Sequence, residues 1–374
     1  MGVIRVLATL ALVVVAACNG FGSAPPPTGA SPTPTASVDI KRTKLDISYT
    51  SLSDQDVHKV SSKKILEGAI NAINAEIKKT GGKGDMAMIE FQDATESTGP
   101  DFKKFAEAAA AVKALNPQIT ADRFADVAIE GMMSATPDCH TYYVDKNNGV
   151  HRSRPEPTSG SQARIPTTGT SLGGPDEAGL TGRMLPGGIV YITWHEFAVT
   201  GTYKIFDEVR KMMDKGLAAG GKAWLFDLRG NVGGFDSDTI AGFFLDGEKM
   251  LNVLYRGGGA TISTSARKEW RLPDAYQLPL VIILNDRGGS GPEVLAADLK
   301  ENKRATIVGS KSIGCMGATS ITNMTDGSRL AVVTQEFVGA QTGTIYNNVG
   351  VPPDVQADDV TAVDKAIEIL KQKM

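Results

Sequence analysis

The chain has 374 residues, of which 41% are hydrophobic and 22% charged, and 39 Lys and Arg against 42 Asp and Glu give a net charge of -3. This composition is typical of a folded soluble protein and excludes wholesale disorder or a collagen-like chain. Without a basic excess, nucleic acid is not an expected partner. Three cysteines are too few for a zinc ribbon or a disulfide scaffold. The length predicts two domains at about 100 to 200 residues each.

The first eighteen residues have the pattern of an export signal. After Arg5, residues 6–17 form an uncharged run of 12 residues, which is too short at about 1.5 Å per residue for a hydrocarbon core about 30 Å thick. The run ends in Ala16, Ala17 and Cys18, which resembles the lipobox of bacterial lipoproteins. We therefore expect residues 1–18 to be a lipoprotein signal peptide with Cys18 as the lipidation site. Ordinary signal cleavage nearby is the alternative.

Residues 19–37 contain five prolines and no charge. Such a segment predicts an extended tether that holds the folded part away from a membrane. The expected location is therefore the bacterial cell envelope, with the exported chain anchored to a membrane by its N-terminal lipid. Disulfides persist in that compartment, and Cys139 and Cys315 are the two cysteines that remain after Cys18.

The next part of the chain is predicted to be helical. Apolar residues recur at helical spacing, and Thr120 is a typical N-cap residue. Helices are expected at 61–79, at 101–115 and from Thr120 onward. We therefore expect a helical N-terminal domain over residues 38–144. Residues 145–188 are rich in Gly, Pro, Ser and Thr, which predicts a loop-rich connection.

From residue 189 onward, short apolar segments alternate with helical patterns. Strands are expected at 189–193, 223–227, 280–285 and 305–308, helices at 202–217, 236–244 and 293–302, and further β structure at 328–334. This alternation predicts an α/β core over residues 189–374 with a mostly parallel sheet and flanking helices. In such sheets, functional residues gather in the loops after the carboxyl ends of the strands.

The turn after the strand at 223–227 contains Asp227, Arg229, Asn231, Gly233 and Gly234. The first three are expected to stabilise the turn, with a charge-assisted bond between Asp227 and Arg229. The consecutive glycines let backbone amides approach a ligand closely, so the turn is a candidate oxyanion cradle. The alternative is a plain strand-to-helix turn whose glycines supply positive φ.

The turn after the strand at 280–285 places Ser290 between glycines at the start of a helix. A serine in that position presents its hydroxyl beside backbone donors, as in a nucleophile elbow. The alternative is helix capping, with Ser290 as N-cap and Glu293 completing a capping box. The four histidines form no HExxH or comparable cluster, so neither a catalytic metal nor another cofactor is expected.

Five segments, in this order, resemble the C-terminal processing (tail-specific) peptidases and their tricorn-like relatives: 129–144, 187–197, 223–234, 279–314 and 347–355. The resemblance implies the ββα arrangement of crotonase-like folds, a polypeptide substrate and hydrolysis by a serine nucleophile. The peptide-binding PDZ module of this family would fall in 145–188, which is too short to hold one. Substrate selection is therefore expected to differ.

The resemblance also implies roles for individual residues. Ser290 takes the position of the nucleophile, and the oxyanion is held by the amide of Gly291 with one from Gly233 or Gly234. Where the Ser-Lys members have their lysine, this chain has Cys315, so that dyad is not available.

Tricorn-like relatives use a histidine in the D-x-H-T segment, which here is His140. Their orienting glutamate corresponds to Asn347, whose amide can still accept a hydrogen bond from an imidazole. Glu336 is a fallback orienting acid. His195 with Glu196 is an alternative base, unless the two merely lie at the rim of the cleft. His58 and His151 lie in polar stretches and are expected to be exposed to solvent.

The resemblance implies that the segments of Cys139 and Cys315 line the same cleft. We therefore expect these two cysteines to form a disulfide; two unlinked thiols are the alternative. The leading hypothesis is a lipid-anchored extracytoplasmic serine endopeptidase that uses Ser290 and His140. The alternatives are a weakly active or inactive relative that binds a peptide or a small apolar ligand, and an envelope scaffold.

Overall fold

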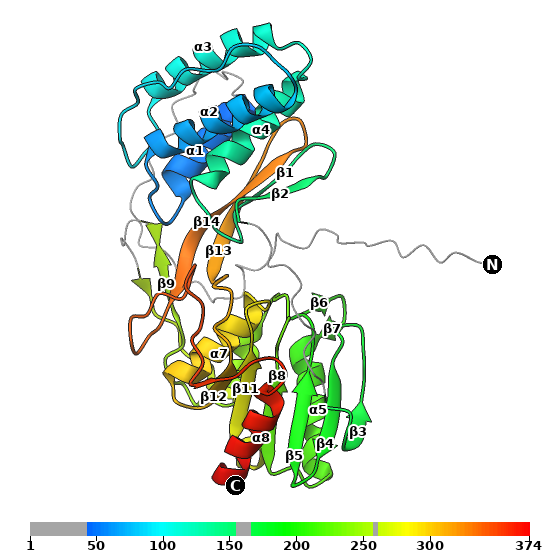
Figure 1. Ribbon diagram of the computed structural model, residues 1–374. Helices are drawn as coiled ribbons and strands as arrows, with labels where there is room; N and C mark the ends of the chain where they lie inside the picture. Colours follow the sequence, from blue (N-terminus) through cyan, green and yellow to red (C-terminus); the bar gives the residue numbers. More distant parts are fainter. Residues whose placement is uncertain (1–42, 155–165, 257–260) are drawn as a thin grey trace, which may run out of the picture. The chain divides into compact units, whose positions relative to one another are not determined.

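The computed structural model describes residues 43–154, 166–256 and 261–374 (Figure 1). The expected signal peptide, the lipidation site at Cys18 and the tether lie outside these described residues. Within the described ranges, every helix is too short or too polar to span a lipid bilayer.

Four helices come first: α1 (Lys44–Gln55), α2 (Ser62–Lys79), α3 (Gly99–Leu115) and α4 (Ala121–Ser134). The hydroxyls of Ser61 and Thr120 cap α2 and α4 by accepting hydrogen bonds from backbone amides three residues on. The three expected helices are therefore present. Helix α1 was not predicted, because its buried face is rich in small polar side chains such as Ser48 and Ser53.

A first, antiparallel sheet joins distant parts of the chain. Its strands run in the order β10-β9-β14-β1-β2, with β13 also paired to β14. Their bounds are β1 (Tyr142–Val144), β2 (Val150–Arg152), β9 (Asn252–Tyr255), β10 (Thr261–Ile262), β13 (Gly317–Asn323) and β14 (Arg329–Val338). The core of the helices continues onto this sheet through Tyr143, Leu330 and Val332. Residues expected in separate domains thus share one sheet and one core.

The second sheet has the strand order β15-β12-β11-β8-β5-β4-β3. Its strands are β3 (Thr170–Gly173), β4 (Thr181–Leu185), β5 (Ile189–Thr193), β8 (Ala223–Asp227), β11 (Leu280–Leu284), β12 (Thr306–Gly309) and β15 (Val355–Gln356). From β5 to β15 all neighbours are parallel, whereas β4 pairs antiparallel with both β3 and β5. The predicted α/β class with a mostly parallel sheet is confirmed.

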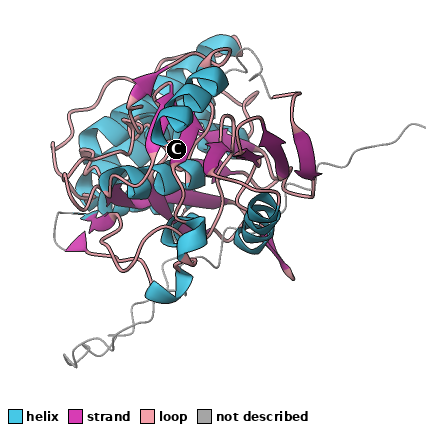
Figure 2. Ribbon diagram, turned by 90° about the horizontal axis from the view of Figure 1, so that it is seen from below, coloured by secondary structure: helices cyan, strands magenta, loops and turns pink. Residues whose placement is uncertain are grey.

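Helices cover both faces of this sheet. Alternate strand residues such as Phe226 and Ile282 pack against α5 (Ile205–Ala218), α6 (Ser237–Gly242) and α7 (Gly291–Glu301). The other face, which includes Leu225 and Ile283, packs against α8 (Ala362–Lys373). Figure 1 shows α8, in red, beside β8 and β11, and the view from below shows helices around the strands (Figure 2). A short hairpin, β6 (Val199–Thr200) and β7 (Tyr203–Lys204), precedes α5.

The connection expected to be loop-rich, residues 145–188, contains β2, β3 and β4 in its described part. Two of these strands extend the mostly parallel sheet, so the boundary expected at residue 189 falls between paired strands. Strand β3 has the sequence TSLG, which has little β-forming character, and its pairing with β4 decides its structure.

Candidate active site

The two turns singled out in the sequence lie against each other. They follow β8 and β11, which are parallel neighbours, so both turns leave the same edge of the sheet. The amide of Gly230 donates to Asn285 Oδ1 at 3.0 Å, and the amide of Gly289 donates to the carbonyl of Asn231 at 3.1 Å. Each turn thus fixes the backbone of the other.

A buried ion pair stabilises the first turn. Arg229 donates from Nε and Nη2 to the two carboxylate oxygens of Asp227, at 2.8 and 2.6 Å. The hydroxyl of Tyr191 donates to the same carboxylate at 2.9 Å. Burial, together with the nearby Asp227 charge, raises the pKa of Tyr191, so this hydroxyl remains a donor. Arg229 and Asp227 thus form a bidentate ion pair, which is consistent with their expected role in stabilising the turn.

Asn231 determines which glycine amide is available for a ligand. Its Oδ1 accepts from the amide of Gly233 at 2.9 Å, and its Nδ2 donates to the carbonyl of Trp194 at 2.9 Å. Gly233 was expected as a possible oxyanion donor, but its amide already has an acceptor inside the turn and is not available for a ligand. The amides of Gly234 and Gly291 donate to no other described residue and remain the candidate pair.

Ser290 has a strained backbone, with φ 68° and ψ -115°. Positive φ is uncommon for a residue with a side chain, and such strain clusters at functional sites. The serine is also the N-cap residue of α7, and its amide donates to Glu293 Oε2 at 2.9 Å. The elbow and the capping interpretation therefore describe the same turn. A Cβ added to Gly233 would lie 2.6 Å from Ser290 Cβ, so only glycine fits beside the serine.

Glu293 does more than cap the helix. Its Oε2 also accepts from the amide of Cys315 at 2.7 Å, while Oε1 accepts from the Ser312 hydroxyl and, at 2.6 Å, from the Gly314 amide. Burial raises the pKa of this carboxyl, and the hydrogen bonds act in the opposite direction. Glu293 thus ties the turn of Ser290 to the turn that carries Cys315. The capping-box spacing marks Glu293 in the sequence, but nothing there indicates this second role.

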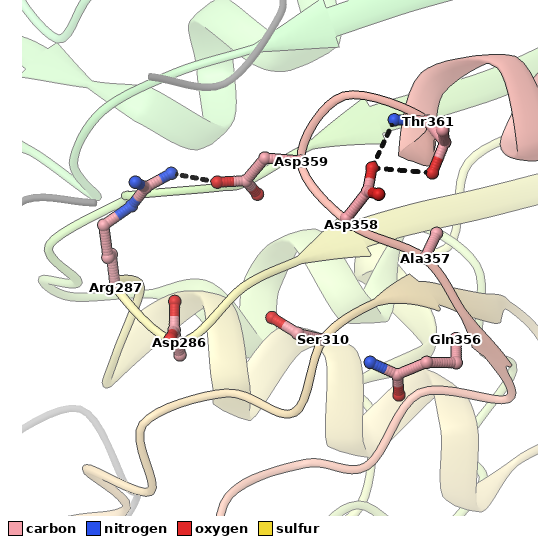
Figure 3. A pocket seen from close by; sticks show the side chains of 8 residues that line it. All are labelled: Asp286, Arg287, Ser310, Gln356, Ala357, Asp358, Asp359 and Thr361. Carbon is pink, nitrogen blue, oxygen red and sulfur yellow. Dashed lines mark hydrogen bonds and ion pairs between the residues drawn. The ribbon is translucent and has the colours of Figure 1, made fainter. Parts of the chain in front are cut away.

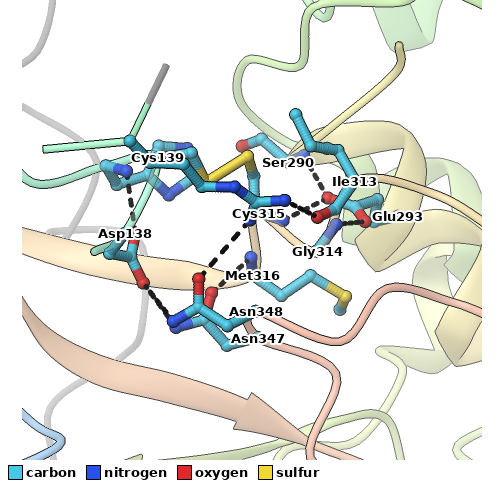
Figure 4. The surroundings of a disulfide bond; sticks show 12 residues. Asp138, Cys139, Ser290, Glu293, Ile313, Gly314, Cys315, Met316, Asn347 and Asn348 are labelled. Carbon is cyan, nitrogen blue, oxygen red and sulfur yellow. Dashed lines mark hydrogen bonds between the residues drawn. A yellow bond between two sulfur atoms is a disulfide. The ribbon is translucent and has the colours of Figure 1, made fainter. Parts of the chain in front are cut away.

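Cys139 and Cys315 form the expected disulfide, with a Cα–Cα distance of 5.7 Å. A Cβ added to Gly289 would lie 3.2 Å from Cys315 Sγ, so the disulfide lies against the residue that precedes Ser290. Figure 4 shows the disulfide with Ser290 and Glu293 close by. The other cysteine precedes His140, so this bond joins the histidine segment to the turn of Ser290.

His140 is half-buried, and this burial lowers its pKa, although the Asp138 charge opposes the shift. The imidazole is therefore neutral near pH 7. Its Nδ1 is buried and has no hydrogen-bond partner among the described residues. Within the same part of the chain, no hydrogen bond joins the ring to Ser290. The loop itself is fixed, because the His140 amide donates to Asp138 Oδ1 at 2.8 Å.

Asn347 does not contact the imidazole as expected. Its Nδ2 donates to Asp138 Oδ2 at 2.7 Å, and its Oδ1 accepts from the Met316 amide at 2.9 Å. The reason is that Asp138 is wholly buried beside it, and a buried carboxylate attracts the nearest amide donor. Asn347 thus acts on the loop of His140 and not on its ring, which corrects the expected orienting role.

Residues 188–357 match the model of peptidase family S41. The chain contains an S41 peptidase domain. It is 29% identical over 177 residues to carboxyl-terminal-processing peptidase 3 of Arabidopsis thaliana, a match that covers 47% of this chain and 32% of that protein. It is 27% identical over 165 residues to the carboxy-terminal processing protease CtpA of Bacillus subtilis, which covers 43% and 33% of the two chains. The chain therefore spans about a third of these relatives.

Two solved structures resemble the fold over most of the chain. A lipoprotein from Streptococcus agalactiae has a TM-score of 0.50 at 14% identity, and the match covers 84% of this chain and 97% of that one. A putative peptidase from Parabacteroides merdae has a TM-score of 0.50 at 15% identity, with 82% and 96% covered. The similarity of fold thus extends beyond the S41 domain to the helices that precede it.

The remaining histidines of the chain have different surroundings. His195 and Glu196 are exposed. The carbonyl of His195 accepts from the Val232 amide at 2.9 Å, so this pair of residues lies beside the glycine turn that follows β8. His58 and His151 were expected to be exposed, but each ring lies between two carboxylates at 2.9 to 3.2 Å. His58 is exposed as expected, whereas His151 is half-buried. Each ring has one carboxylate partner nearby in the sequence and one, Glu336 or Glu130, from a distant segment.

One group of potential metal ligands is present among the described residues. Single ligand atoms of Asp138, Cys139 and His140 lie within 4.8 Å of one another. However, the Cys139 sulfur is bonded to Cys315, and both Asp138 oxygens accept hydrogen bonds from the protein. This donor set does not fit a metal ion.

A cavity of about 660 Å³ opens beside the turn that carries Ser290 (Figure 3). Its lining is polar and includes Asp286, Arg287 and the ion-paired Asp359. A smaller cavity of about 270 Å³ is lined in part by Arg154 and by Ser312 and Ile313. The last two residues belong to the turn that carries Cys315. Neither cavity includes Ser290 in its lining.

Proposed function

We propose that this chain is a lipid-anchored, extracytoplasmic serine endopeptidase with Ser290 as nucleophile and His140 as general base. The observation that carries the proposal is the strained backbone of Ser290 at the start of α7, inside an S41 domain. Strain of this kind persists only where the surrounding structure enforces it. Here Glu293 and the adjoining glycine turn do so.

In this mechanism the neutral imidazole of His140 removes the proton from the Ser290 hydroxyl as the oxygen attacks a peptide carbonyl. The amides of Gly291 and Gly234 donate to the oxyanion of the tetrahedral intermediate. The protonated His140 then gives its proton to the leaving amine, and a water molecule hydrolyses the acyl-enzyme ester by the same steps. Burial supports the role of His140, because a lowered pKa keeps the base unprotonated.

The disulfide compensates in part for two departures from the family pattern. Cys315 stands where a lysine base is expected, and among the described residues no carboxylate forms a hydrogen bond with the His140 ring, although the nearby Asp138 charge favours the imidazolium. Because Cys139 is bonded to Cys315, the residue after it is held on the side of the nucleophile turn. The same departures favour the second candidate, peptide binding without turnover.

Labelling with a fluorophosphonate probe separates the two candidates. The proposal expects the wild-type protein to be labelled and Ser290→Ala to be unlabelled. Ser310→Ala is the matched control, because Ser310 lines the neighbouring cavity and its loss should leave labelling unchanged. A folded wild-type protein that neither reacts with the probe nor cleaves casein would contradict the enzymatic proposal and favour binding.

A further inference from the structure

A chain of polar contacts leads from the segment after α1 to the loop of His140. It begins at His58, whose Nδ1 lies 3.2 Å from Asp56 Oδ1 and whose Nε2 lies 2.9 Å from Glu336 Oε1. His58 precedes α2, whereas Glu336 lies on β14. The histidine therefore joins the helical part of the chain to the antiparallel sheet.

The chain of contacts continues from Glu336 to the candidate base. Asn347 Nδ2 donates to Glu336 Oε1 at 3.5 Å and to Asp138 Oδ2 at 2.7 Å. Asp138 Oδ1 in turn accepts from the His140 amide. One amide nitrogen thus lies between two carboxylates, and the second carboxylate holds the backbone of His140.

Burial makes these contacts interdependent. Asp56 and Asp138 are wholly buried, and Glu336 and Asn347 are 7% and 2% exposed. Two carboxylates that share one amide nitrogen repel each other strongly where water is scarce. A cation next to Glu336 offsets that repulsion. Hydrogen bonds to Asp56 and Glu336 raise the pKa of His58 to about 10, so this histidine supplies the positive charge at neutral pH.

We infer that His58 and Glu336 are positioning residues for His140 that act through Asn347 and Asp138. Without the His58 cation, repulsion between Glu336 and Asp138 shifts Asn347 and loosens the acceptor of the His140 amide. The helical part would then set the geometry of the base without touching substrate. The catalytic consequence rests on the proposed function, whereas the structural link to His140 does not.

His151 provides a matched control. It also bridges two carboxylates, Glu130 and Asp145, with both distances 3.0 Å. Its side chain is 26% exposed, against 28% for His58. Among the described residues, neither of these carboxylates contacts the His140 loop. A general loss of stability would affect both histidine variants alike, whereas a positioning role predicts a difference between them.

The experiment compares His58→Gln and His151→Gln in the mature, oxidised protein. The first readout is hydrogen exchange of the His140 backbone amide, which needs no enzymatic activity. Exchange should be about tenfold faster in His58→Gln and unchanged in His151→Gln, because only the first loosens Asp138. The second readout is peptide hydrolysis, for which His58→Gln should lower kcat about tenfold and leave KM unchanged.

A second pair of variants tests the charge and the contact separately, and keeps the test decisive if His58→Gln does not fold. Glu336→Gln retains an acceptor for Asn347, so the His140 amide should stay protected. Glu336→Ala removes the acceptor, and protection should fall. Equal exchange at His140 in wild type, Glu336→Ala and Glu336→Gln, or equal acceleration by His151→Gln, would overturn the inference. A wild-type protein that hydrolyses no peptide would instead refute the proposed function. The exchange data would still test the structural link between His58 and the His140 loop.

Discussion

Glu293 accepts the backbone amide of Ser290 with the same carboxylate oxygen, Oε2, that accepts the amide of Cys315. The carboxylate therefore sets the distance between the turn of Ser290 and the turn that carries Cys315. Since Glu293 is wholly buried, no water competes for these bonds, and a small change at this position acts on both turns together.

Glu293→Gln is a small change in side-chain shape, but it should slow the reaction of Ser290 with the probe markedly. Both carboxylate oxygens accept two hydrogen bonds, so either orientation of a glutamine places its NH2 group against two donors. Loss of these bonds should cost about 3 kcal/mol of stability, and probe labelling per folded molecule should slow by at least about tenfold. Urea unfolding and labelling kinetics measure the two effects.

Glu301→Gln is the control on the same helix. Glu301 accepts from Gln341, Thr342 and Tyr346, so its substitution should also lower stability. The labelling rate of the folded fraction should stay at the wild-type value, because Ser290 is not held by Glu301. Equal slowing in both variants would show that Glu293 acts only through general stability.

The pH dependence of peptide hydrolysis should report a histidine with a lowered pKa. Because burial lowers the pKa of His140, its imidazole is already mostly neutral at the usual histidine pKa of about 6.5. The acid limb of kcat/KM should therefore have its inflection below that pH and reach a plateau above it. An inflection well above pH 7 would contradict His140 as the base, as would a rate unaffected by His140→Ala.

Some of this architecture follows from local sequence patterns. Strands β5 and β8 are mostly apolar and are buried on both faces, and their predicted bounds match the structure. The glycine turns after β8 and β11 were recognisable because strand, turn and helix follow one another within a few residues. Adjacent parallel strands then bring Asn231 and Gly289 together.

Long-range pairing was not predictable in this way. Strand β1 pairs with β14, for example Tyr143 with Leu330, and no periodicity within three residues encodes so distant a partner. The same holds for the contacts of His58, which its polar surroundings in the sequence do not indicate. Its partner Glu336 comes from the far end of the chain. Contacts of this kind depend on the complete fold. The hydrogen bond from Asn347 to Asp138 is another example.

Arg229→Met should destabilise the first turn strongly. The substitution leaves the Asp227 carboxylate, which is 3% exposed, without its bidentate partner. Removing one member of a buried ion pair costs about 3 to 5 kcal/mol, which urea unfolding can measure. Lys365→Met breaks an exposed pair with Glu368 and should cost less than about 1 kcal/mol. Similar losses in both variants would show that Arg229 contributes no more than a surface charge.

Cys18→Ser should abolish lipid attachment in a bacterial host that processes lipoproteins. The thiol of Cys18 is the only group at the expected cleavage site that fits a lipobox-like pattern. Wild-type protein should incorporate an alkyne fatty acid and sediment with membranes, and the Cys18→Ser protein should do neither. The Cys139→Ser/Cys315→Ser double variant should still be labelled. An unlabelled wild-type protein whose mature N-terminus lies elsewhere would support ordinary signal cleavage.

Reduction of the Cys139–Cys315 bond should lower both stability and activity. The two cysteines are 176 residues apart, and closing a loop of that size stabilises the folded chain by about 5 kcal/mol on the chain-entropy model. The bond also ties the His140 segment to the residue before Ser290. A reductant should therefore lower Tm and slow probe labelling of the wild-type protein. The Cys139→Ser/Cys315→Ser variant should start at those lower values and not respond to the reductant. If that variant labels as fast as the oxidised wild type, the disulfide stabilises the fold without positioning the base.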